Sequence, residues 1–266
     1  MNSGLNSKGV ALVTGASAGI GAVYADRLAK RGHDLILVAR DAAKLSAVAE
    51  HIRATTGRQV ELVTADLSVK EDLRRVEEQL RSDERITLLV NNAGMGATQT
   101  LVDSDVDRLE QMIQLNVTAL TRLTHAVAPA MIRRGKGAII NIASVVALAP
   151  ELLNGTYGGT KAYVLAFTQS LNHELASHGI QVQAVLPGAT STNFWALSGR
   201  PVEHLPSAIV MSAEDMVDAS LVGFDRRELV TIPALPDAED WQKLEAARKA
   251  LGPNLSRANA AARYQA

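Results

Sequence analysis

Tyr157 and Lys161 are the side chains of this sequence whose types and spacing best suit proton-transfer chemistry. Positions i and i+4 lie on one face of a helix, so the two side chains point the same way, one turn apart. A neighbouring ammonium group favours the phenolate and lowers the pKa of a phenol from its usual value of about 10. Such a phenol can give a proton to a carbonyl oxygen, or take one from an alcohol, near neutral pH. Taken alone, however, the pair is more often an ordinary exposed pair on a helix.

A serine hydroxyl is expected close to this pair. Ser144 lies thirteen residues before Tyr157 and follows an apolar segment, Ala138–Ile142, that reads as a strand. Ligands bind at the carboxyl ends of the strands in an open parallel sheet. A hydroxyl at that place can hydrogen-bond a substrate oxygen. The alternative is a turn serine that caps the next segment.

The segment Thr14–Gly21 reads T-G-x-x-x-G-x-G and directly follows the apolar run Val10–Val13. Glycine is needed where the backbone turns with positive φ or where a phosphate approaches main-chain N–H groups. The helix that begins near Ile20 offers unpaired N–H groups and a positive dipole end, which suit a pyrophosphate. The segment therefore predicts a dinucleotide-binding turn. The alternative is a purely structural turn between strand and helix.

Short apolar segments alternate with helical patterns, and they show little in–out alternation, as expected for strands covered on both faces. We expect strands at Val10–Val13, Asp34–Ala39, Gln59–Thr64, Thr87–Val90, Ala138–Ile142, Gln181–Leu186 and Glu228–Ile232. Helices are expected at Ile20–Arg31, Ala42–Thr55, Val69–Arg81, Asp105–Arg134, 155–177 and Asp237–Leu251. This order predicts an α/β protein with a three-layer, doubly wound Rossmann fold and a seven-stranded parallel sheet. Ser68 is expected to cap the third helix, and Pro129 to bend or end the fourth.

Composition limits the classes of function. The chain has 266 residues, a net charge of −1 and no cysteine, so we expect no nucleic-acid or membrane partner and no thiolate metal site. The six histidines show no metal-ligand spacing. The polar start, Met1–Lys8, lacks an apolar signal region, and a cytoplasmic location is expected. We expect a single dinucleotide-binding and catalytic domain over 1–266, with a substrate loop at about 191–211 and an additional C-terminal segment at about 237–266.

In order, these motifs resemble the short-chain dehydrogenase/reductase family, in its compact single-domain subclass. The resemblance covers about residues 10–192. It rests on the turn Thr14–Gly21, Asp66, Asn91-Asn92-Ala93-Gly94, Asn116, Ser144, Tyr157 with Lys161, and Pro187-Gly188.

The resemblance implies a role for each catalytic residue. Tyr157 would be the general acid/base, and Lys161 would lower its pKa and hold the nicotinamide ribose hydroxyls. Ser144 would orient the reacting carbonyl. Asn116 would bind a water that links Lys161 to solvent. One departure is the Gly-Gly-Thr between Tyr157 and Lys161, because glycine weakens a helix start by about 1 kcal/mol relative to alanine.

The resemblance also implies the cofactor contacts. Asp66 would contact the adenine amino group, although it could equally cap the following helix. The segment Asn91–Gly94 would form the cofactor floor, and Thr190 and Thr192 would meet the nicotinamide carboxamide. The full expected set is Gly15, Ser17, Gly19, Ile20, Gly21, Arg40, Asp66, Asn92, Gly94, Tyr157, Lys161, Pro187, Gly188, Thr190 and Thr192.

Arg40 favours NADP over NAD. A carboxylate at the end of the second strand would bind the adenosine 2′-hydroxyl of NAD, but here that place is Ala39, followed by Arg40. A guanidinium suits a phosphate, and Ser17 could add a hydroxyl contact. Asp41 could instead pair with Arg40.

Substrate contacts are expected from Met95–Thr98, Val145–Leu153 and Ser191–Met211. The last segment holds Phe194, Trp195 and Leu197, which could form a lid over a nonpolar substrate or could be core or subunit-contact residues.

We therefore expect an NADP(H)-dependent oxidoreductase that moves a hydride between nicotinamide and an apolar carbonyl or secondary alcohol of modest size. The alternatives are a catalytically silent dinucleotide-binding regulatory protein and a 3-oxoacyl-type reductase of fatty acid metabolism. The resemblance also implies a homo-oligomer, a tetramer or a dimer, paired through two helices. The apolar residues expected in that interface are Leu109, Met112, Ile113, Leu120, Leu123, Ala162, Leu165, Ala166 and Leu171.

Overall fold

The computed structural model describes residues 8–265. The polar start of the chain, apart from Lys8, lies outside the described residues. The chain divides after Pro233 into two compact units, which we describe separately.

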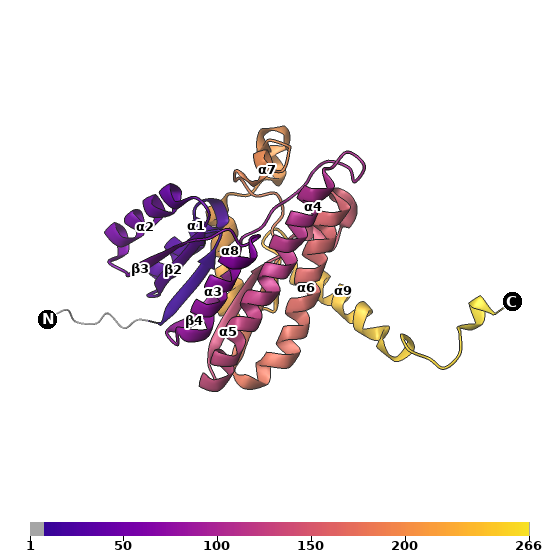
Figure 1. The fold of residues 1–266 in the computed structure, drawn as a ribbon. Helices are drawn as coiled ribbons and strands as arrows, with labels where there is room; N and C mark the ends of the chain where they lie inside the picture. Colours follow the sequence, from indigo (N-terminus) through magenta and orange to yellow (C-terminus); the bar gives the residue numbers. More distant parts are fainter. Residues whose placement is uncertain (1–7, 266) are drawn as a thin grey trace. The chain divides into compact units, whose positions relative to one another are not determined.

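The larger unit is built on a seven-stranded parallel sheet in the order β3-β2-β1-β4-β5-β6-β7. Figure 1 shows β2, β3 and β4 with the helices that flank the sheet. The strands are β1 Val10–Thr14, β2 Asp34–Ala39, β3 Val60–Thr64, β4 Ile86–Asn91, β5 Gly137–Ile142, β6 Ile180–Val185 and β7 Val230–Thr231. The chain order reverses direction between β1 and β4, which is the switch point where doubly wound sheets bind ligands. The predicted fold class is confirmed.

Helices cover both faces of the sheet. They are α1 Gly19–Lys30, α2 Ala42–Thr56, α3 Lys70–Ser82, α4 Val106–Ile113, α5 Leu120–Arg134, α6 Gly155–Leu175, α7 Phe194–Leu197 and α8 Ala213–Asp225. Alternate residues of β1 define the two cores. Ala11 and Val13 pack with α1, α2 and α8, whereas Val10 and Leu12 pack with α3, α5 and α6. The two faces of one strand are thus buried in different layers, as the unbroken apolar runs predict.

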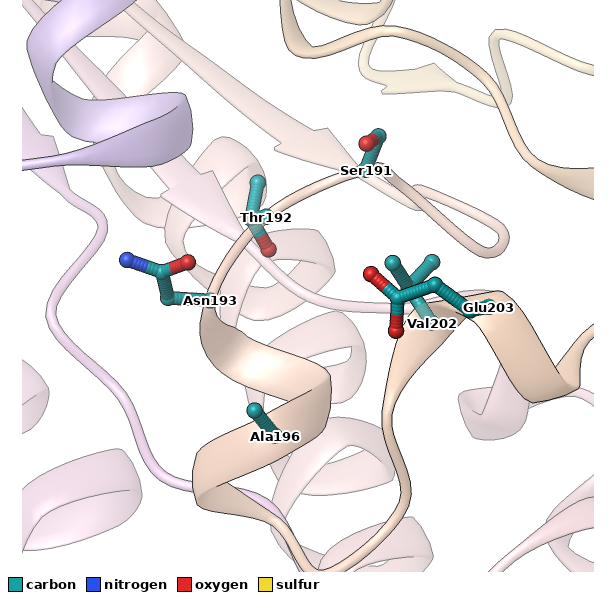
Figure 2. A pocket seen from close by; sticks show the side chains of 6 residues that line it. All are labelled: Ser191, Thr192, Asn193, Ala196, Val202 and Glu203. Carbon is teal, nitrogen blue, oxygen red and sulfur yellow. The ribbon is translucent and has the colours of Figure 1, made fainter.

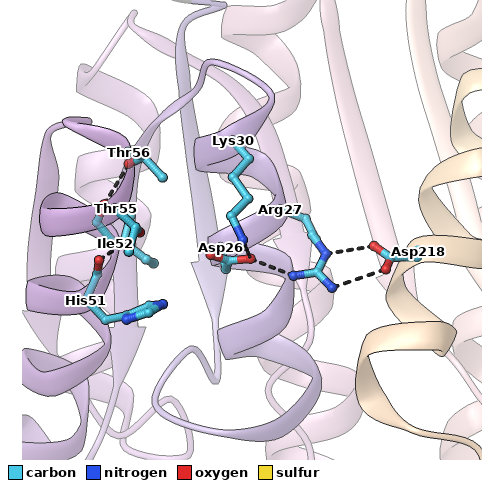
Figure 3. A network of polar contacts seen from close by, with 8 residues as sticks. All are labelled: Asp26, Arg27, Lys30, His51, Ile52, Thr55, Thr56 and Asp218. Atoms are coloured by element: carbon cyan, nitrogen blue, oxygen red, sulfur yellow. Dashed lines mark hydrogen bonds and ion pairs between the residues drawn. The ribbon is translucent and has the colours of Figure 1, made fainter.

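Ion pairs fix α8 against α1 on one face of the sheet (Figure 3). Arg27 Nε and Nη2 donate to the two carboxylate oxygens of Asp218, at 2.8 and 3.1 Å. In the core beneath, the hydroxyls of Tyr24 and Ser220 form a hydrogen bond. Because α8 directly follows the 191–211 segment, these contacts anchor the downstream end of the predicted substrate loop.

One local prediction is wrong, and a second is wrong in part. Ser68 does not cap α3: the helix begins at Lys70 after Val69, and Ser68 instead donates its N–H and hydroxyl to the Asp66 carboxylate. Pro129 does not end its helix, because α5 continues to Arg134, and a bend at this residue stays a prediction. The buried residues Val127, Ala130 and Met131 on either side of the proline hold this stretch against the sheet, so tertiary packing outweighs the lost hydrogen bond.

The smaller unit contains one longer helix, α9 Ala238–Ala250, which Asp237 caps by accepting from Glu239 N at 2.8 Å. α9 has no buried residue. In the part of the chain that the structure describes, no helix is long and apolar enough to cross a membrane.

Candidate active site

The glycine-rich turn is held in shape by Thr14 and Asn92. The Thr14 hydroxyl donates to Val90 O and accepts from Asn92 N, which joins β1 to β4. The Asn92 amide donates to Thr14 O at 2.9 Å and to Gly15 O at 3.3 Å. A methyl group added at Gly21 would lie 2.3 Å from Gly15 O, so only glycine allows α1 to begin this close to the turn. Asn92 is therefore a residue that shapes the turn.

The start of α1 offers open main-chain donors. Its N-cap residue, Ala18, provides no side-chain hydrogen bond, and no acidic residue lies in its first turn. Gly19 has a φ of 53°, and a methyl group added there would lie 3.0 Å from Thr192 Cγ2. The turn therefore faces the segment that follows β6. Uncapped N–H groups and the helix dipole fit the pyrophosphate of a dinucleotide at this place. Ser17 is partly exposed beside them, and Ile20 packs on the core below.

Arg40 is exposed at the end of β2 and pairs loosely with Asp66, at 3.7 Å. Asp41 does not pair with Arg40, because its carboxylate caps α2 through Lys44 N at 3.0 Å and pairs with the Lys44 ammonium at 3.2 Å. These contacts hold the pKa of the Asp41 carboxyl below its usual range. Apart from the loose pair with Asp66, the exposed guanidinium of Arg40 is open to an anion beside β2.

Tyr157 is buried in the first turn of α6, and Asn154 fixes that turn. The Asn154 Oδ1 atom accepts from Thr156 N at 2.9 Å and from Tyr157 N at 3.4 Å. Its amide donates to Gln99 O at 2.8 Å and to Ser104 Oγ at 3.3 Å. Our sequence analysis missed Asn154, although an asparagine directly before a helix start is a recognisable N-cap signal.

Asn116 lies in a stretch of π-helix, Gln114–Ala119, between α4 and α5. Its side chain is pinned: Oδ1 accepts from Met95 N at 2.8 Å, while Nδ2 donates to Met95 O at 2.8 Å and to Thr160 Oγ1 at 3.0 Å. Thr160 in turn donates to Tyr157 O at 2.8 Å. Asn116 is therefore joined to the backbone of Tyr157 through Thr160, a second residue that the sequence analysis did not assign.

Lys161 is buried beside Tyr157, with its ammonium 5.8 Å from the centre of the phenol ring. Its Nζ donates to Ile142 O at the end of β5, at 2.8 Å. A methyl group added at Gly94 would lie 3.6 Å from Lys161 Nζ and 3.2 Å from Asn116 Oδ1. The end of β5, the segment that follows β4 and the start of α6 thus meet at this lysine.

Burial dominates the pKa of both groups in this structure, and the lowering of the Tyr157 pKa by Lys161 stays a prediction. Burial raises the pKa of the Tyr157 phenol to about 12, and a hydrogen bond with Ser144 only partly opposes that rise. Burial also lowers the pKa of the Lys161 ammonium to about 8. The dominant effect on both groups is loss of hydration.

Ser144 caps the turn that follows β5, and its contact with a substrate oxygen stays a prediction. Its hydroxyl accepts from Val146 N at 3.3 Å, as a turn-capping serine does. It also donates to Pro187 O at 3.4 Å and contacts the Tyr157 hydroxyl. The contact between the Ser144 and Tyr157 hydroxyls therefore joins the ends of β5 and β6 to the start of α6.

The segment after β6 lines a hollow of about 240 Å³ (Figure 2). Its walls are Ser191, Thr192, Asn193, Ala196, Val202 and Glu203. Thr192 Oγ1 accepts from Phe194 N at 3.4 Å, and Thr190 Oγ1 donates to Gly188 O at 3.2 Å. Thr190 is buried, so only Thr192 of these two threonines is partly exposed.

The three apolar residues of the expected lid separate into three environments. The centre of the Phe194 ring lies 5.8 Å from the centre of the Tyr157 ring. Trp195 is buried and donates from Nε1 to Thr190 O at 3.0 Å, which ties α7 to the end of the sheet. Leu197 is 71% exposed. Trp195 is therefore a core residue, and the lid over a substrate stays a prediction for Phe194.

The arrangement joins a dinucleotide-binding turn to a buried phenol at the carboxyl edge of one parallel sheet. Among residues 8–265 no group of acidic or histidine side chains could hold a metal ion. A proton donor next to a dinucleotide site is typical of carbonyl–alcohol oxidoreductases.

Comparison with known proteins agrees with that class. Residues 9–201 match the family model "short chain dehydrogenase". The chain belongs to the short chain dehydrogenase family and is an oxidoreductase.

Two solved structures are similar over nearly the whole chain. A short-chain dehydrogenase from Sphingobium yanoikuyae in complex with NADPH is 52% identical, with a TM-score of 0.94, and the match covers 97% of this chain and 100% of that one. The bulky-bulky ketone specific alcohol dehydrogenase from Comamonas testosteroni is 46% identical, with a TM-score of 0.91, and the match covers 98% of this chain and 100% of that one.

Curated relatives are more distant. Hydroxysteroid dehydrogenase-like protein 1 of Gallus gallus is 37% identical over 191 residues, 71% of this chain and 57% of that protein. The very-long-chain 3-oxoacyl-CoA reductase of Mus musculus is 35% identical over 202 residues, 74% of this chain and 64% of that protein. The matches thus span less than two thirds of these relatives.

Proposed function

We propose that this protein is an NADPH-dependent reductase of apolar ketones, and that it oxidises the corresponding secondary alcohols with NADP. The observation that carries the proposal is the buried Tyr157 hydroxyl, hydrogen-bonded to Ser144 within an apolar cluster. Similarity to the NADPH complex from Sphingobium yanoikuyae supports the cofactor, as does the exposed guanidinium of Arg40.

The residues present fit this cofactor. The uncapped start of α1 would hold the pyrophosphate, and Arg40 with Ser17 would hold the 2′-phosphate. Thr192 and the backbone near Thr190 would meet the carboxamide. When bound, NADPH supplies the hydride that reduces the carbonyl carbon.

The chain's own residues then handle the proton. A phenol with a pKa of about 12 is protonated at neutral pH, so Tyr157 can donate its proton to the carbonyl oxygen as the C–O bond becomes single. Ser144 orients that oxygen. The buried Lys161 ammonium stabilises the resulting phenolate, and a proton that enters from solvent by way of Lys161 restores the phenol. Asn116 positions Tyr157 through Thr160. The Asn116 amide donates to the Thr160 hydroxyl, which in turn donates to Tyr157 O.

The apolar surroundings of Tyr157 favour a hydrophobic ketone. Leu109, Met112 and Val146 are buried beside the phenol, and Met95 and Leu153 pack against them. The similarity to the ketone-specific enzyme of Comamonas testosteroni supports a ketone with a bulky group on each side of the carbonyl. The mouse relative supports a second candidate, a 3-oxoacyl thioester.

A substrate screen tests the proposal. The purified protein is assayed with NADPH and NADH against a dialkyl ketone, two aryl ketones and a 3-oxoacyl thioester, by following absorbance at the nicotinamide band. The proposal expects turnover of the ketones with NADPH. Turnover of the thioester alone would establish the second candidate. Tight NADPH binding with no turnover of any carbonyl would support the regulatory alternative.

We also propose a homo-oligomer, although most residues first expected in its interface do not support one. Leu109, Met112, Leu120, Leu123, Leu165 and Leu171 are buried within the monomer. Ile113 on α4, together with Ala162, Tyr163 and Ala166 on α6, is exposed. These residues are the apolar surface that a second copy could cover. Light scattering at micromolar concentration tests the oligomeric state, because a monomer mass with full activity would refute the proposal.

The cytoplasmic location stays a prediction.

A further inference from the structure

Phe194 lies directly against the catalytic phenol. The two rings are 5.8 Å apart between centres and tilted by 45°. Phe194 also packs on the apolar cluster that surrounds Tyr157, whose other buried members are Leu109, Met112 and Val146. The phenol is 5% exposed while Phe194 is only partly buried. Phe194 therefore forms part of what separates the phenol from solvent.

The Phe194 ring also lies against the backbone at Gly96. A methyl group added at Gly96 would lie 2.2 Å from Phe194 Cζ and 2.9 Å from Cε2. A residue with a side chain at position 96 would displace the ring. The absence of a side chain there allows the ring to lie between the 95–98 segment and the phenol.

The backbone of Phe194 is held at both ends. Its N–H donates to Thr192 Oγ1 at 3.4 Å, and its carbonyl accepts from Ser198 Oγ at 2.7 Å. Ser198 O in turn accepts from Thr98 N at 3.2 Å and from Thr98 Oγ1 at 2.8 Å. The backbone that carries the ring is thus held between Thr192, the residue expected to meet the nicotinamide, and Ser198.

We propose that Phe194 sets the size of ketone that reaches Tyr157, an inference that rests on the proposed function. A ketone whose oxygen reaches the Tyr157 hydroxyl must place a substituent in the apolar cluster around the phenol, where the Phe194 ring already fills space. A smaller side chain at position 194 admits a larger substituent, and a larger side chain excludes it. Packed sites discriminate single methylene groups by about 10-fold or more, so the effect is measurable.

The test compares two ketones that differ on one side only, phenyl methyl ketone and phenyl butyl ketone, at saturating NADPH. The quantity measured is the ratio of their kcat/KM values, larger over smaller. In Phe194→Ala this ratio should rise about tenfold or more above that of the wild type, and in Phe194→Trp it should fall by a similar factor. Leu197→Ala is the matched control, because Leu197 lies on the same short helix but is largely exposed. Its ratio should equal that of the wild type.

The ratio separates a size filter from a loss of lid stability. A loosened lid would change kcat/KM for both ketones by one factor and leave the ratio unchanged. Equal ratios in wild type, Phe194→Ala and Phe194→Trp, or shifts of the same sign, would overturn the inference. If Phe194→Trp fails to fold by circular dichroism, Phe194→Leu replaces it and should give a ratio between those of wild type and Phe194→Ala. Wild type that reduces neither ketone would instead refute the proposed function.

Discussion

Replacing Asn154 by alanine should weaken both the fold and the catalytic step, because this one side chain sets the start of α6. It caps the helix through Thr156 N and Tyr157 N, and it ties the helix to Gln99 and Ser104. The loss of an N-cap costs about 0.5–2 kcal/mol. The lost bond to the Gln99 carbonyl adds about 0.5–1.5 kcal/mol. We therefore expect the free energy of unfolding to fall by about 2 kcal/mol.

The catalytic effect should exceed what this stability loss alone would cause. Tyr157 lies in the same turn, and Gly155 and Gly158 make that turn weak without its cap. Because small misplacements of a catalytic group can cost about a hundredfold in rate, we expect kcat to fall about 10–100-fold. The KM for NADPH should change little, since Asn154 contacts none of the expected cofactor residues except the backbone of Tyr157.

Urea unfolding and steady-state kinetics check this expectation side by side. Asn154→Ser is the matched control, because a serine oxygen can still cap the helix while the bonds to the 99–104 segment are lost. It should recover part of both the stability and kcat. The reasoning would be refuted if Asn154→Ala unfolds within about 0.5 kcal/mol of wild type. An unchanged kcat in a destabilised variant would show that Asn154 has only a structural role.

Four further outcomes are expected. Tyr157→Phe should fold and bind NADPH but lose about 10²–10⁴-fold in kcat, and retention of more than a tenth of the rate would contradict the assignment. Arg40→Asp should weaken NADPH binding by about 1.5–3 kcal/mol and favour NADH. Arg74→Ala, which removes another exposed charge, should leave NADPH binding unchanged. Equal use of both cofactors by the wild type would contradict the role of Arg40 in binding the 2′-phosphate. The rate of ketone reduction should be constant below pH 8 and fall above it, because the buried Lys161 ammonium, whose pKa is about 8, loses its proton there. An unchanged pH profile in Lys161→Met would exclude this cause. Gly159→Ala should raise the free energy of unfolding by about 0.5–1 kcal/mol, because a methyl group there meets no atom within 4 Å, and chemical denaturation measures it.

The sheet could be predicted from the sequence almost completely. β2 begins and ends at the predicted residues, Asp34 and Ala39, because a buried parallel strand is an unbroken apolar run with polar ends. β7 is shorter than predicted, with only Val230 and Thr231 paired. It is an edge strand with one neighbour, so pairing with β6 rather than its own residues sets its length.

The candidate catalytic residues could be located from the sequence, but their hydrogen-bond partners could not. Spacing places Tyr157 and Lys161 on one helix face, yet nothing in the sequence shows that Asn116 binds Met95 and Thr160. Those contacts join segments far apart in the chain. Periodicity also failed at Asn116, where the helix changes to π geometry without any break in its apolar pattern.

The expected lid shows the same limit for single residues. Phe194, Trp195 and Leu197 read as one apolar cluster, but neighbouring positions of a helical turn point in different directions. Trp195 turns inward to Thr190, Phe194 lies on Tyr157 and Leu197 faces solvent. Composition therefore predicted an apolar lid and could not say which of its residues touches the phenol.

The Gly-Gly-Thr between Tyr157 and Lys161 raised the question of whether the catalytic helix is rigid enough. In the structure, contacts on either side of the glycines hold this helix in place. A methyl group added at Gly158 would lie 3.3 Å from Pro150 Cβ, so a small residue lets the 150–152 turn pack closely on α6. Asn154 caps the helix before the glycines, and Thr160 binds Asn116 after them. Tertiary hydrogen bonds thus supply the rigidity that helix propensity lacks, which is why the weakest part of α6 can hold the residue whose position matters most.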